Sequence, residues 1–337
     1  MTASDTAGPA PRARAGQLLY LSRADVEALC LPPAEVIAAV AEALRELGSG
    51  AAEMPAKPGI HTRPDSFIHA MPAYLPSLGA AGIKWISGYP ANTARGLPYI
   101  SGLLMLNDPG TGLPLCVMDA TWITAARTGA ATAVAARFLA RPDSKSLAIL
   151  GCGVQGRSNL EMLRTELPGL CEIRAFDIRA EAASAYAAWA EAAFDVTVRV
   201  AASPRDAVQG ADIVVTAGPI LQEPSPVIEP GWLAEGVFCC TLDFDSYVSP
   251  EAMEACPRRL TDELAQLAYY RKAGYFRRTP PIEEDLGMLL TGRIPGRSNP
   301  GERILAVNLG LAVEDMACAV RLYERATRQG AGVRLPL

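Results

Sequence analysis

The chain has 337 residues, of which half are apolar and a fifth are charged, and its formal net charge is −5. This balance is typical of a soluble protein with an ample core, and the length suggests two domains or one large α/β domain. Acidic and basic residues are interspersed, so no basic stripe is available for nucleic acid or an anionic membrane. We therefore favour a small molecule as the partner.

The first residues, 1–14, resemble a disordered tail. They lack the apolar segment of a signal peptide, and no stretch of the chain reaches the length of a transmembrane helix, so we expect a cytoplasmic protein. The eight cysteines show no C-x-x-C spacing, which fits reduced thiols. His61 and His69 are the only histidines, and neither lies in a nucleophile-elbow context, which argues against a histidine-rich metal site or a Ser-His-Asp triad.

The first third of the chain predicts a helical region followed by strands. Residues 23–50 carry apolar side chains at helical spacing and end in Gly48-Ser49-Gly50. Residues 53–120 contain the apolar runs FIHAMPAYL, GIKWISGY and YISGLLMLND, separated by Gly, Pro and Asn. The segment DPGTGLPLCVM predicts a tight turn, and hence a hairpin or meander. A long alanine-rich helix follows and ends by Pro142.

Short β-type runs then alternate with helical stretches from SLAIL, at residue 146, to RRLTDE, at residue 258. This alternation is typical of an α/β protein with a doubly wound parallel sheet. From about residue 304, ILAVNLGLAVEDMACAVRLYERATRQGAG predicts a final long amphipathic helix that returns to the first domain.

A glycine-rich turn points to a dinucleotide. Gly151, Gly153 and Gly156 follow the apolar strand SLAIL and open a helix, which is the context that a G-x-G-x-x-G motif requires. Asp177 ends the next strand about 20 residues later, where a carboxylate accepts hydrogen bonds from the adenosine ribose. An acid there repels a 2′-phosphate, so NAD(H) is favoured, although the nearby Arg179 leaves NADP(H) open. The alternative is a glycine turn that binds nothing.

Three charged residues stand in apolar or small-residue surroundings: Lys84 in GIKWI, Arg127 in a helix poor in charge, and Asp245 after the apolar strand of GVFCCTLDFDSYV. Each has a structural explanation, since Lys84 can extend toward solvent, Arg127 can be a solvated helix charge, and Asp245 can cap a helix. Together, two cations and a carboxylate beside a nicotinamide suit an amino acid. The cations would pair with its carboxylate, and Asp245 would act on its nitrogen.

At these motifs the chain resembles the ornithine cyclodeaminase/mu-crystallin family. The resemblance runs from MPAKPGIHTRPDSFIHAMPAYL through LGCGVQGRSNLE to NLGLAVEDMACA. It implies a Rossmann NAD-binding domain over residues 126–304, and an α+β substrate-binding and dimerisation domain over residues 15–125 and 305–337. It also implies a homodimer built through the latter domain.

The family's motifs assign roles to individual positions. They make Asp245 the acid/base at the substrate nitrogen and Lys84 its catalytic companion, which holds the substrate carboxylate with Arg127; Met71 matches a pocket methionine. The remaining cofactor positions are Gly151, Gly153, Val154, Gln155, Gly156, Asp177, Thr216 and Thr128. No metal is implied.

Three departures from the family pattern bear on the substrate. Lys57 stands in MPAK where the family usually has arginine, and Tyr99 follows G-L-P where threonine is usual. The loop LDFDSYV, with a second carboxylate and aromatic residues, replaces a glycine-rich G-x-D. Lys57 and Tyr99 are therefore candidate substrate-binding residues, and ornithine itself is not predicted.

The leading hypothesis is an NAD(P)-dependent enzyme that acts at the α-carbon of an amino acid or of its cyclic or secondary imine, as an amino-acid dehydrogenase or ketimine reductase. One alternative is a cyclodeaminase that releases ammonia with catalytic NAD. Another, of a different class, is a protein that binds NAD(P)H and a small ligand without turnover.

Overall fold

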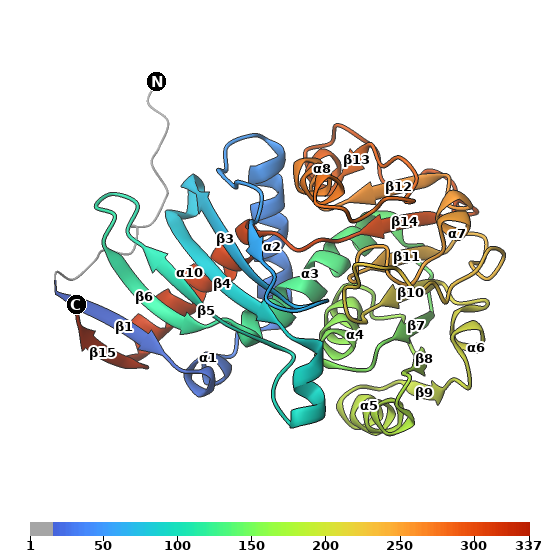
Figure 1. Cartoon of the computed structure of the whole chain (residues 1–337), viewed down its shortest axis with the longest axis horizontal. Helices are drawn as coiled ribbons and strands as arrows, with labels where there is room; N and C mark the ends of the chain where they lie inside the picture. Colours follow the sequence, from blue (N-terminus) through green and yellow to red (C-terminus); the bar gives the residue numbers. More distant parts are fainter. Residues whose placement is uncertain (1–15) are drawn as a thin grey trace. The chain divides into compact units, whose positions relative to one another are not determined.

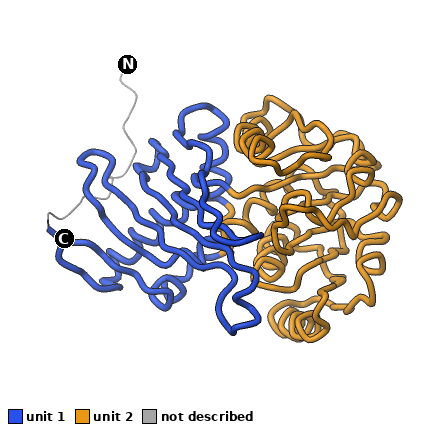
Figure 2. Tube along the Cα trace, viewed as in Figure 1, with its two compact units in different colours: residues 1–32, 38–124, 311–337 blue, residues 33–37, 125–310 orange. Residues whose placement is uncertain are grey.

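The computed structural model describes residues 16–337, so the predicted tail at 1–14 lies outside the described residues. The chain forms two compact units (Figure 2). Of the described residues, unit 1 holds 16–32, 38–124 and 311–337, and unit 2 holds 33–37 and 125–310. None of the helices formed by residues 16–337 has the length and apolar character needed to cross a membrane.

Unit 1 is built on a seven-stranded mixed sheet (Figure 1). β1 pairs in parallel with β6, and the other neighbours are antiparallel. The meander predicted within residues 53–120 is confirmed, including the hairpin between β5 and β6. In spatial order the strands are β15 (Val333–Pro336), β1 (Gln17–Leu21), β6 (Pro114–Asp119), β5 (Ile100–Asn107), β4 (Ala80–Gly88), β3 (Phe67–Leu75) and β2 (Gly59–Ile60).

Three helices accompany this sheet: α1 (Arg23–Leu29), α2 (Pro33–Gly48) and α10 (Ala312–Gln329). The single helical region predicted for residues 23–50 is two helices, because Cys30 adopts a left-handed conformation and prolines follow it. α10 packs on β3, β4 and β5 and buries Lys84, Leu104 and their neighbours on that face. Side chains alternate along each strand, so Trp85 and Leu103 point to the opposite face.

Unit 2 is an eight-stranded, all-parallel sheet, as the alternating pattern predicts. Its strand order reverses at β7, as in doubly wound folds. In spatial order the strands are β13 (Glu284–Asp285), β12 (Arg258–Thr261), β14 (Ile304–Val307), β11 (Phe238–Thr241), β10 (Ile213–Thr216), β7 (Ser146–Leu150), β8 (Glu172–Phe176) and β9 (Thr197–Val200).

The helices of unit 2 lie between these strands in the chain. Several short ones begin at capping side chains, such as Ser203, Ser249 and Asp285, which accept a backbone N–H of the first turn. The helices are α3 (Thr121–Leu139, which begins in unit 1), α4 (Val154–Glu166), α5 (Ala180–Ala193), α6 (Pro204–Val208), α7 (Pro250–Glu254), α8 (Leu264–Lys272) and α9 (Leu286–Leu290).

The prediction of a helix from residue 304 is wrong. Ile304–Val307 is the buried strand β14, inserted between β11 and β12, and α10 begins only at Ala312. The run ILAV is apolar on both faces, as a central parallel strand requires, and a short run of this kind cannot be told from a buried helical turn by periodicity alone. The predicted sheet therefore lacks β14, and it also lacks the two-residue edge strand β13.

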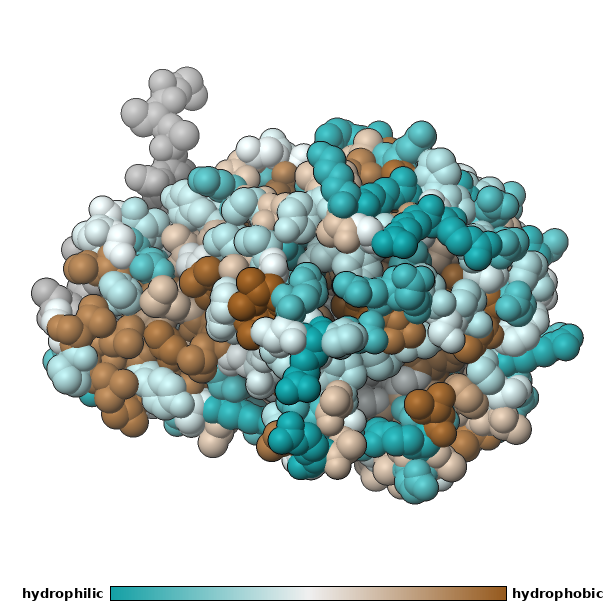
Figure 3. Space-filling model, in the orientation of Figure 1, coloured by the Kyte–Doolittle hydropathy of each residue, from teal (hydrophilic) through white to brown (hydrophobic). Residues whose placement is uncertain are grey.

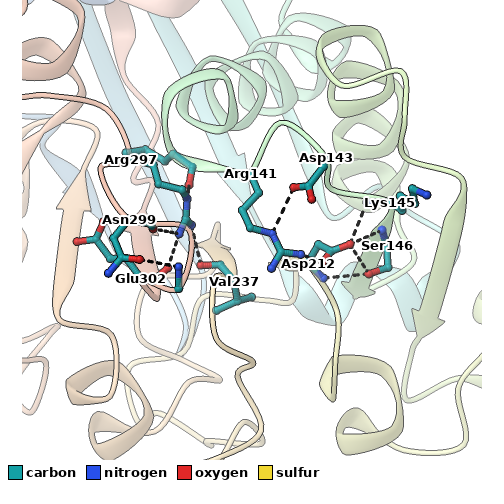
Figure 4. Close-up of polar contacts among 11 residues, drawn as sticks. Arg141, Asp143, Lys145, Ser146, Asp212, Val237, Arg297, Asn299 and Glu302 are labelled. Atoms are coloured by element: carbon teal, nitrogen blue, oxygen red, sulfur yellow. Dashed lines mark hydrogen bonds and ion pairs between the residues drawn. The ribbon is translucent and has the colours of Figure 1, made fainter.

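Polar side chains fasten the amino ends of the central strands of unit 2 (Figure 4). Asp212 accepts hydrogen bonds from the backbone N–H groups of Lys145 and Ser146, both 2.9 Å, from the Ser146 hydroxyl at 2.9 Å, and from Arg141. Burial alone raises the pKa of Asp212, but these donors outweigh it and hold the pKa below its ordinary value. β7 and β10 are thereby tied together at this edge.

Arg297 also joins backbone segments at the amino edge of the sheet, through hydrogen bonds from its guanidinium group. It donates to the backbone carbonyls of Leu139 at 2.7 Å, Val237 at 3.1 Å, Asn299 at 3.3 Å and Glu302. These bonds join the end of α3, the start of β11 and the loop before β14 (Figure 4). Charged groups thus hold the amino edge of the sheet together, whereas doubly wound sheets bind their ligands at the carboxyl edge.

Candidate functional site

The turn between β7 and α4 has the backbone that a dinucleotide site needs. Gly151 has φ +103°, and a Cβ there would lie 2.6 Å from the carbonyl oxygen of Ala217. A Cβ at Gly156 would overlap the Gly151 carbonyl, so the helix packs tightly on the turn. Gly153 caps α4 without a side-chain hydrogen bond and faces open space. The N–H groups of the first turn of α4 are therefore positioned to bind a phosphate group.

Asp177 follows β8 and is fixed from both sides. Its Oδ2 accepts the backbone N–H of Cys152 at 2.9 Å, and its Oδ1 accepts that of Arg179 at 3.0 Å. The side chain is 11% exposed, and the Arg179 Nε lies 3.9 Å from Oδ1. Two carboxylate oxygens offer about four lone-pair sites, so further hydrogen bonds from a ribose can be accepted.

The other predicted cofactor residues in this region lie on two helices that touch. Val154 and Gln155 form the first turn of α4, and Thr128 lies nearly buried in α3. The Ser158 hydroxyl of α4 donates to the carbonyl of Ala125 in α3 at 2.5 Å. A Cβ at Gly129 would lie 2.6 Å from the Ser158 carbonyl, so glycine permits the close approach of α3 to the nucleotide helix.

The loops after β10 and β11 are joined by the second carboxylate of LDFDSYV. Asp243 is fully buried, and its two oxygens accept the Thr216 hydroxyl at 2.7 Å and the Gly218 backbone N–H at 2.9 Å. Burial raises the pKa of Asp243 to about 7, against the effect of these hydrogen bonds. Thr216, predicted near the cofactor, thus donates its hydroxyl hydrogen to a protein carboxylate, and Asp243 holds the loop.

Phe244 separates the two carboxylates of this segment. It has φ +61°, a left-handed conformation that is costly for a bulky residue. Its ring packs against Tyr270, Tyr275 and Phe276, with centroids 4.9 Å, 5.4 Å and 5.1 Å away. An extended segment would place residues 243 and 245 on one face, so this turn lets the two carboxylates find separate partners.

Asp245 itself is 6% exposed. Its Oδ2 accepts the Thr279 hydroxyl at 3.1 Å, whereas its Oδ1 is buried and has no hydrogen-bond partner among residues 16–337. Burial raises the pKa of Asp245 above its ordinary value, opposed by the Thr279 hydrogen bond, by the backbone N–H groups of Asp245 and Phe276, and by the charge of Arg271. A carboxyl group of this kind is suited to take up and return a proton.

Arg127 lies in α3 against the loop that follows β14. Its guanidinium group occupies the space that a Cβ at Gly310 would fill, and Gly310 has φ +78°. The buried carboxylate of Asp262 holds this loop by accepting the backbone N–H groups of Leu309 at 2.7 Å and Gly310 at 2.6 Å. Asp262 was not predicted, although an aspartate directly after the strand RRLT is a signal of this arrangement.

In unit 1, Lys84 has a partner that the sequence analysis missed. Its Nζ lies 2.7 Å from Oδ1 of Asp315 in α10 and 3.3 Å from the Thr124 hydroxyl, and both charged side chains have no exposed surface. The lysine in the apolar strand is therefore compensated by a buried carboxylate. The available signal was the acidic pair in NLGLAVEDMACA, but 231 residues separate Asp315 from Lys84.

Met71, Lys57 and Tyr99 complete the predicted set. Met71 is buried and directly opposite Lys84 on the neighbouring strand. Lys57 is buried before β2, and Tyr99 is half-buried before β5. His69, which was not predicted, is buried on β3, where burial and then the charges of Lys57, His61 and Lys84 lower its pKa to about 3. Among residues 16–337, no group of three or more potential ligands is placed to hold a metal.

The fold and these residues define a dinucleotide-binding protein with a buried carboxylate at the carboxyl edge of its sheet. The chain matches the sequence model of the ornithine cyclodeaminase/mu-crystallin family over residues 18–330. It therefore belongs to this family, as the motifs predict.

Comparison with individual proteins gives the same result. The nodulation efficiency protein NfeD of Rhizobium meliloti is 38% identical over 93% of this chain and 97% of its own length. The structure of Thermococcus litoralis Delta(1)-pyrroline-2-carboxylate reductase with NADH and L-proline is 33% identical, with a TM-score of 0.84, over 94% of this chain and 99% of that one. An archaeal alanine dehydrogenase dimer with bound NAD is 30% identical, with a TM-score of 0.84, over 95% and 99%.

These matches confirm the predicted fold, a Rossmann-type sheet combined with an α+β unit. They extend over almost the whole chain and include dehydrogenases and reductases. The chain is accordingly a dehydrogenase or reductase of the ornithine cyclodeaminase/mu-crystallin family.

Proposed function

We propose that this protein transfers a hydride between NAD(H) and the α-carbon of an amino acid or of its cyclic or secondary imine. The observation that carries the proposal is the Asp245 carboxylate, beyond the carboxyl end of β11. One of its oxygens is bound by Thr279, and the other has no partner among the described residues. An amine or iminium N–H is a donor that would satisfy this oxygen.

The backbone fits the proposed cofactor. The N–H groups at the start of α4 would hold the pyrophosphate, with Gly151, Gly153 and Gly156 allowing its approach, and Asp177 would bind the adenosine ribose. NAD(H) is favoured over NADP(H), because Asp177 would repel a 2′-phosphate. When bound, the nicotinamide supplies the acceptor or the donor of the hydride.

Asp245 would handle the proton that accompanies the hydride. In oxidation the α-carbon loses a hydride and the substrate nitrogen loses a proton, which Oδ1 of Asp245 accepts. In reduction the carboxylate stabilises the protonated imine, and the hydride is added to its carbon. The raised pKa of Asp245 brings the carboxyl group closer to the pH at which proton return is efficient.

The substrate carboxylate would be bound by basic side chains. Arg127 offers a planar pair of donors, and Lys84 offers an ammonium group whose charge is shared with Asp315. Lys57, Met71 and Tyr99 are proposed to contact the rest of the substrate. Arg127→Lys and Lys84→Met are each expected to raise KM for the amino acid more than they lower NADH affinity.

A panel of α-amino acids, cyclic imines and α-keto acids with amines, assayed with NAD(H) and NADP(H), tests the proposal. A net change in the absorbance of the reduced nicotinamide supports a dehydrogenase or reductase. Ammonia release with catalytic NAD and no net change would identify a cyclodeaminase instead. Binding of NADH and ligand without any turnover would identify a binding protein.

We further propose that the active form is a homodimer that covers the open face of the unit 1 sheet. Trp85 and Leu103 are cross-strand neighbours and are 48% and 49% exposed. In Figure 3, hydrophobic residues gather over the sheet of unit 1, and such exposed apolar patches mark interaction surfaces. The archaeal alanine dehydrogenase is a dimer. Light scattering should find a dimer for the native protein and a monomer for Trp85→Lys combined with Leu103→Lys; a variant that remains dimeric would refute this interface.

A further inference from the structure

The groups that favour the ionised form of Asp245 come largely from one distant stretch of the chain. Thr279 donates its hydroxyl to Oδ2 at 3.1 Å, and the backbone N–H of Phe276 and the charge of Arg271 act in the same direction. Arg271 lies in the last turn of α8, and the other two residues lie in the loop between α8 and β13, residues 273–283. This 273–283 loop is therefore the part of unit 2 that surrounds the carboxylate.

The backbone of the 273–283 loop is held in place around Thr279. Arg271 donates to the backbone carbonyls of Thr279 at 3.3 Å and Pro280 at 2.9 Å. Arg259 in β12 donates from its Nε to the carbonyl of Pro281 at 3.1 Å. Thr279 itself is only 9% exposed. Two guanidinium groups thus fix three consecutive carbonyls, and the Thr279 hydroxyl is held at one place beside Asp245.

Two phenylalanines join this loop to the segment that carries Asp245. Phe244, which precedes Asp245, has φ +61°, and Phe276 in the loop has φ +57°. Their buried rings lie with centroids 5.1 Å apart. A left-handed backbone is costly for a bulky residue and persists where the surrounding structure compensates it, which occurs most often at functional sites. The strained backbone is therefore found at the two residues that bring the loop against Asp245.

The two oxygens of the Asp245 carboxylate consequently differ. Oδ2 is anchored by Thr279, whereas Oδ1 is buried without a hydrogen-bond partner among residues 16–337. We propose that Thr279 is a positioning residue for the reaction, because its hydroxyl anchors Oδ2 and thereby directs Oδ1 to the substrate nitrogen. This inference rests on the role of Asp245 stated under Proposed function.

The same hydrogen bond affects the proton affinity of Asp245. A donor to an ionised carboxylate favours the charged form and lowers its pKa, so Thr279 offsets part of the effect of burial. Two charged groups also act here. Arg271 lowers the pKa of Asp245, and Asp243 is a second carboxylate whose own pKa is raised by the charge of Asp245. Loss of the Thr279 hydroxyl should therefore raise the pKa of Asp245.

Thr279→Val tests the proposal, because valine keeps the shape of the side chain and removes the hydroxyl. Oxidation of the best amino acid requires the ionised carboxylate, so the rising limb of the pH profile of kcat/KM should move to higher pH by about one pH unit. At neutral pH, kcat should fall by about tenfold, while KM and NADH affinity stay within about twofold of the native values. Thr279→Ser keeps the hydroxyl and should retain the native pH profile.

Thr291→Val is the matched control, since the Thr291 hydroxyl donates to the carbonyl of Gly287 at 2.7 Å in α9. It should show native kinetics at every pH. A native pH profile and kcat for Thr279→Val would overturn the positioning role and leave the proposed function intact. An equal loss of activity at every pH, with a lower unfolding temperature, would also overturn it and assign Thr279 a structural role. Thr279→Ala provides the same pH profile if the valine variant does not fold. Absence of turnover by the native protein would instead contradict the proposed function and, with it, this role of Thr279.

Discussion

Replacing Asp315 by asparagine leaves the Lys84 ammonium group buried beside a neutral amide. The native Nζ–Oδ1 distance is 2.7 Å, and neither side chain has exposed surface, so solvent cannot compensate the lost charge. Breaking one partner of a buried pair costs about 3–5 kcal/mol, which is a large share of a domain's usual 5–15 kcal/mol. We expect urea unfolding of Asp315→Asn to show a loss in this range.

Two further variants complete this experiment. Lys84→Met with Asp315→Leu replaces the pair by apolar side chains and should recover most of the lost stability, because well-packed hydrophobic residues substitute for buried ion pairs at little cost. The recovered protein should still have an impaired KM for its amino acid, since Lys84 is proposed to bind the substrate. Glu27→Gln, which breaks the exposed Arg23–Glu27 pair, is the control and should cost less than about 0.5 kcal/mol. A loss below about 1 kcal/mol for Asp315→Asn would refute the reasoning.

Three other substitutions test separate features. Asp243 has a pKa of about 7 in the folded state and 3.8 in the unfolded state, so the folded state binds the proton more tightly. The stabilising effect of this bound proton is complete below pH 3.8 and is lost as the pH rises to 7. The free energy of unfolding therefore falls by about 4 kcal/mol over this pH range. Asp243→Asn should flatten the fall in unfolding free energy between these pH values, and an unchanged slope would contradict this. Arg297→Lys cannot reach four carbonyls and should cost about 2–4 kcal/mol in urea unfolding, whereas Arg277→Lys, at a side chain 71% exposed, should cost almost nothing. Gly310→Ala should cost about 1–2 kcal/mol of stability and also raise the substrate KM, because the added methyl group displaces Arg127. Gly330 also has a left-handed backbone but faces open space, so Gly330→Ala is the control and should change stability alone. Equal substrate KM values for the two variants would argue against Arg127 as a substrate ligand.

The sequence predicted the features that depend on local pattern. The glycine spacing at 151–156, the alternation of strands and helices after residue 146, and the meander of unit 1 all follow from short-range periodicity and turn residues. The four residues of β14 are apolar on both faces, so their pattern predicts a helical turn as well as a strand. β1 and β15 were not recognised, since they are short and are stabilised by pairing between the two ends of the described chain.

The missed site residues share a different cause. The partner of Lys84 and the role of Asp262 depend on contacts between segments far apart in the chain. A charged or polar residue in an apolar stretch indicates that a partner exists, but the sequence does not say which one. Lys84 was therefore correctly identified as unusual, while its protein partner, Asp315, became visible only in the fold.

Asp245→Asn measures the central claim most directly. The substitution keeps the size of the side chain and removes its ability to accept a proton, so turnover of the best substrate in the amino- and imino-acid panel should fall by about 10²- to 10⁴-fold. NADH affinity and thermal unfolding should stay close to the native values, because Asp243, Thr216 and the glycine turn are untouched. Native turnover by Asp245→Asn, with NADH bound normally, would contradict the account.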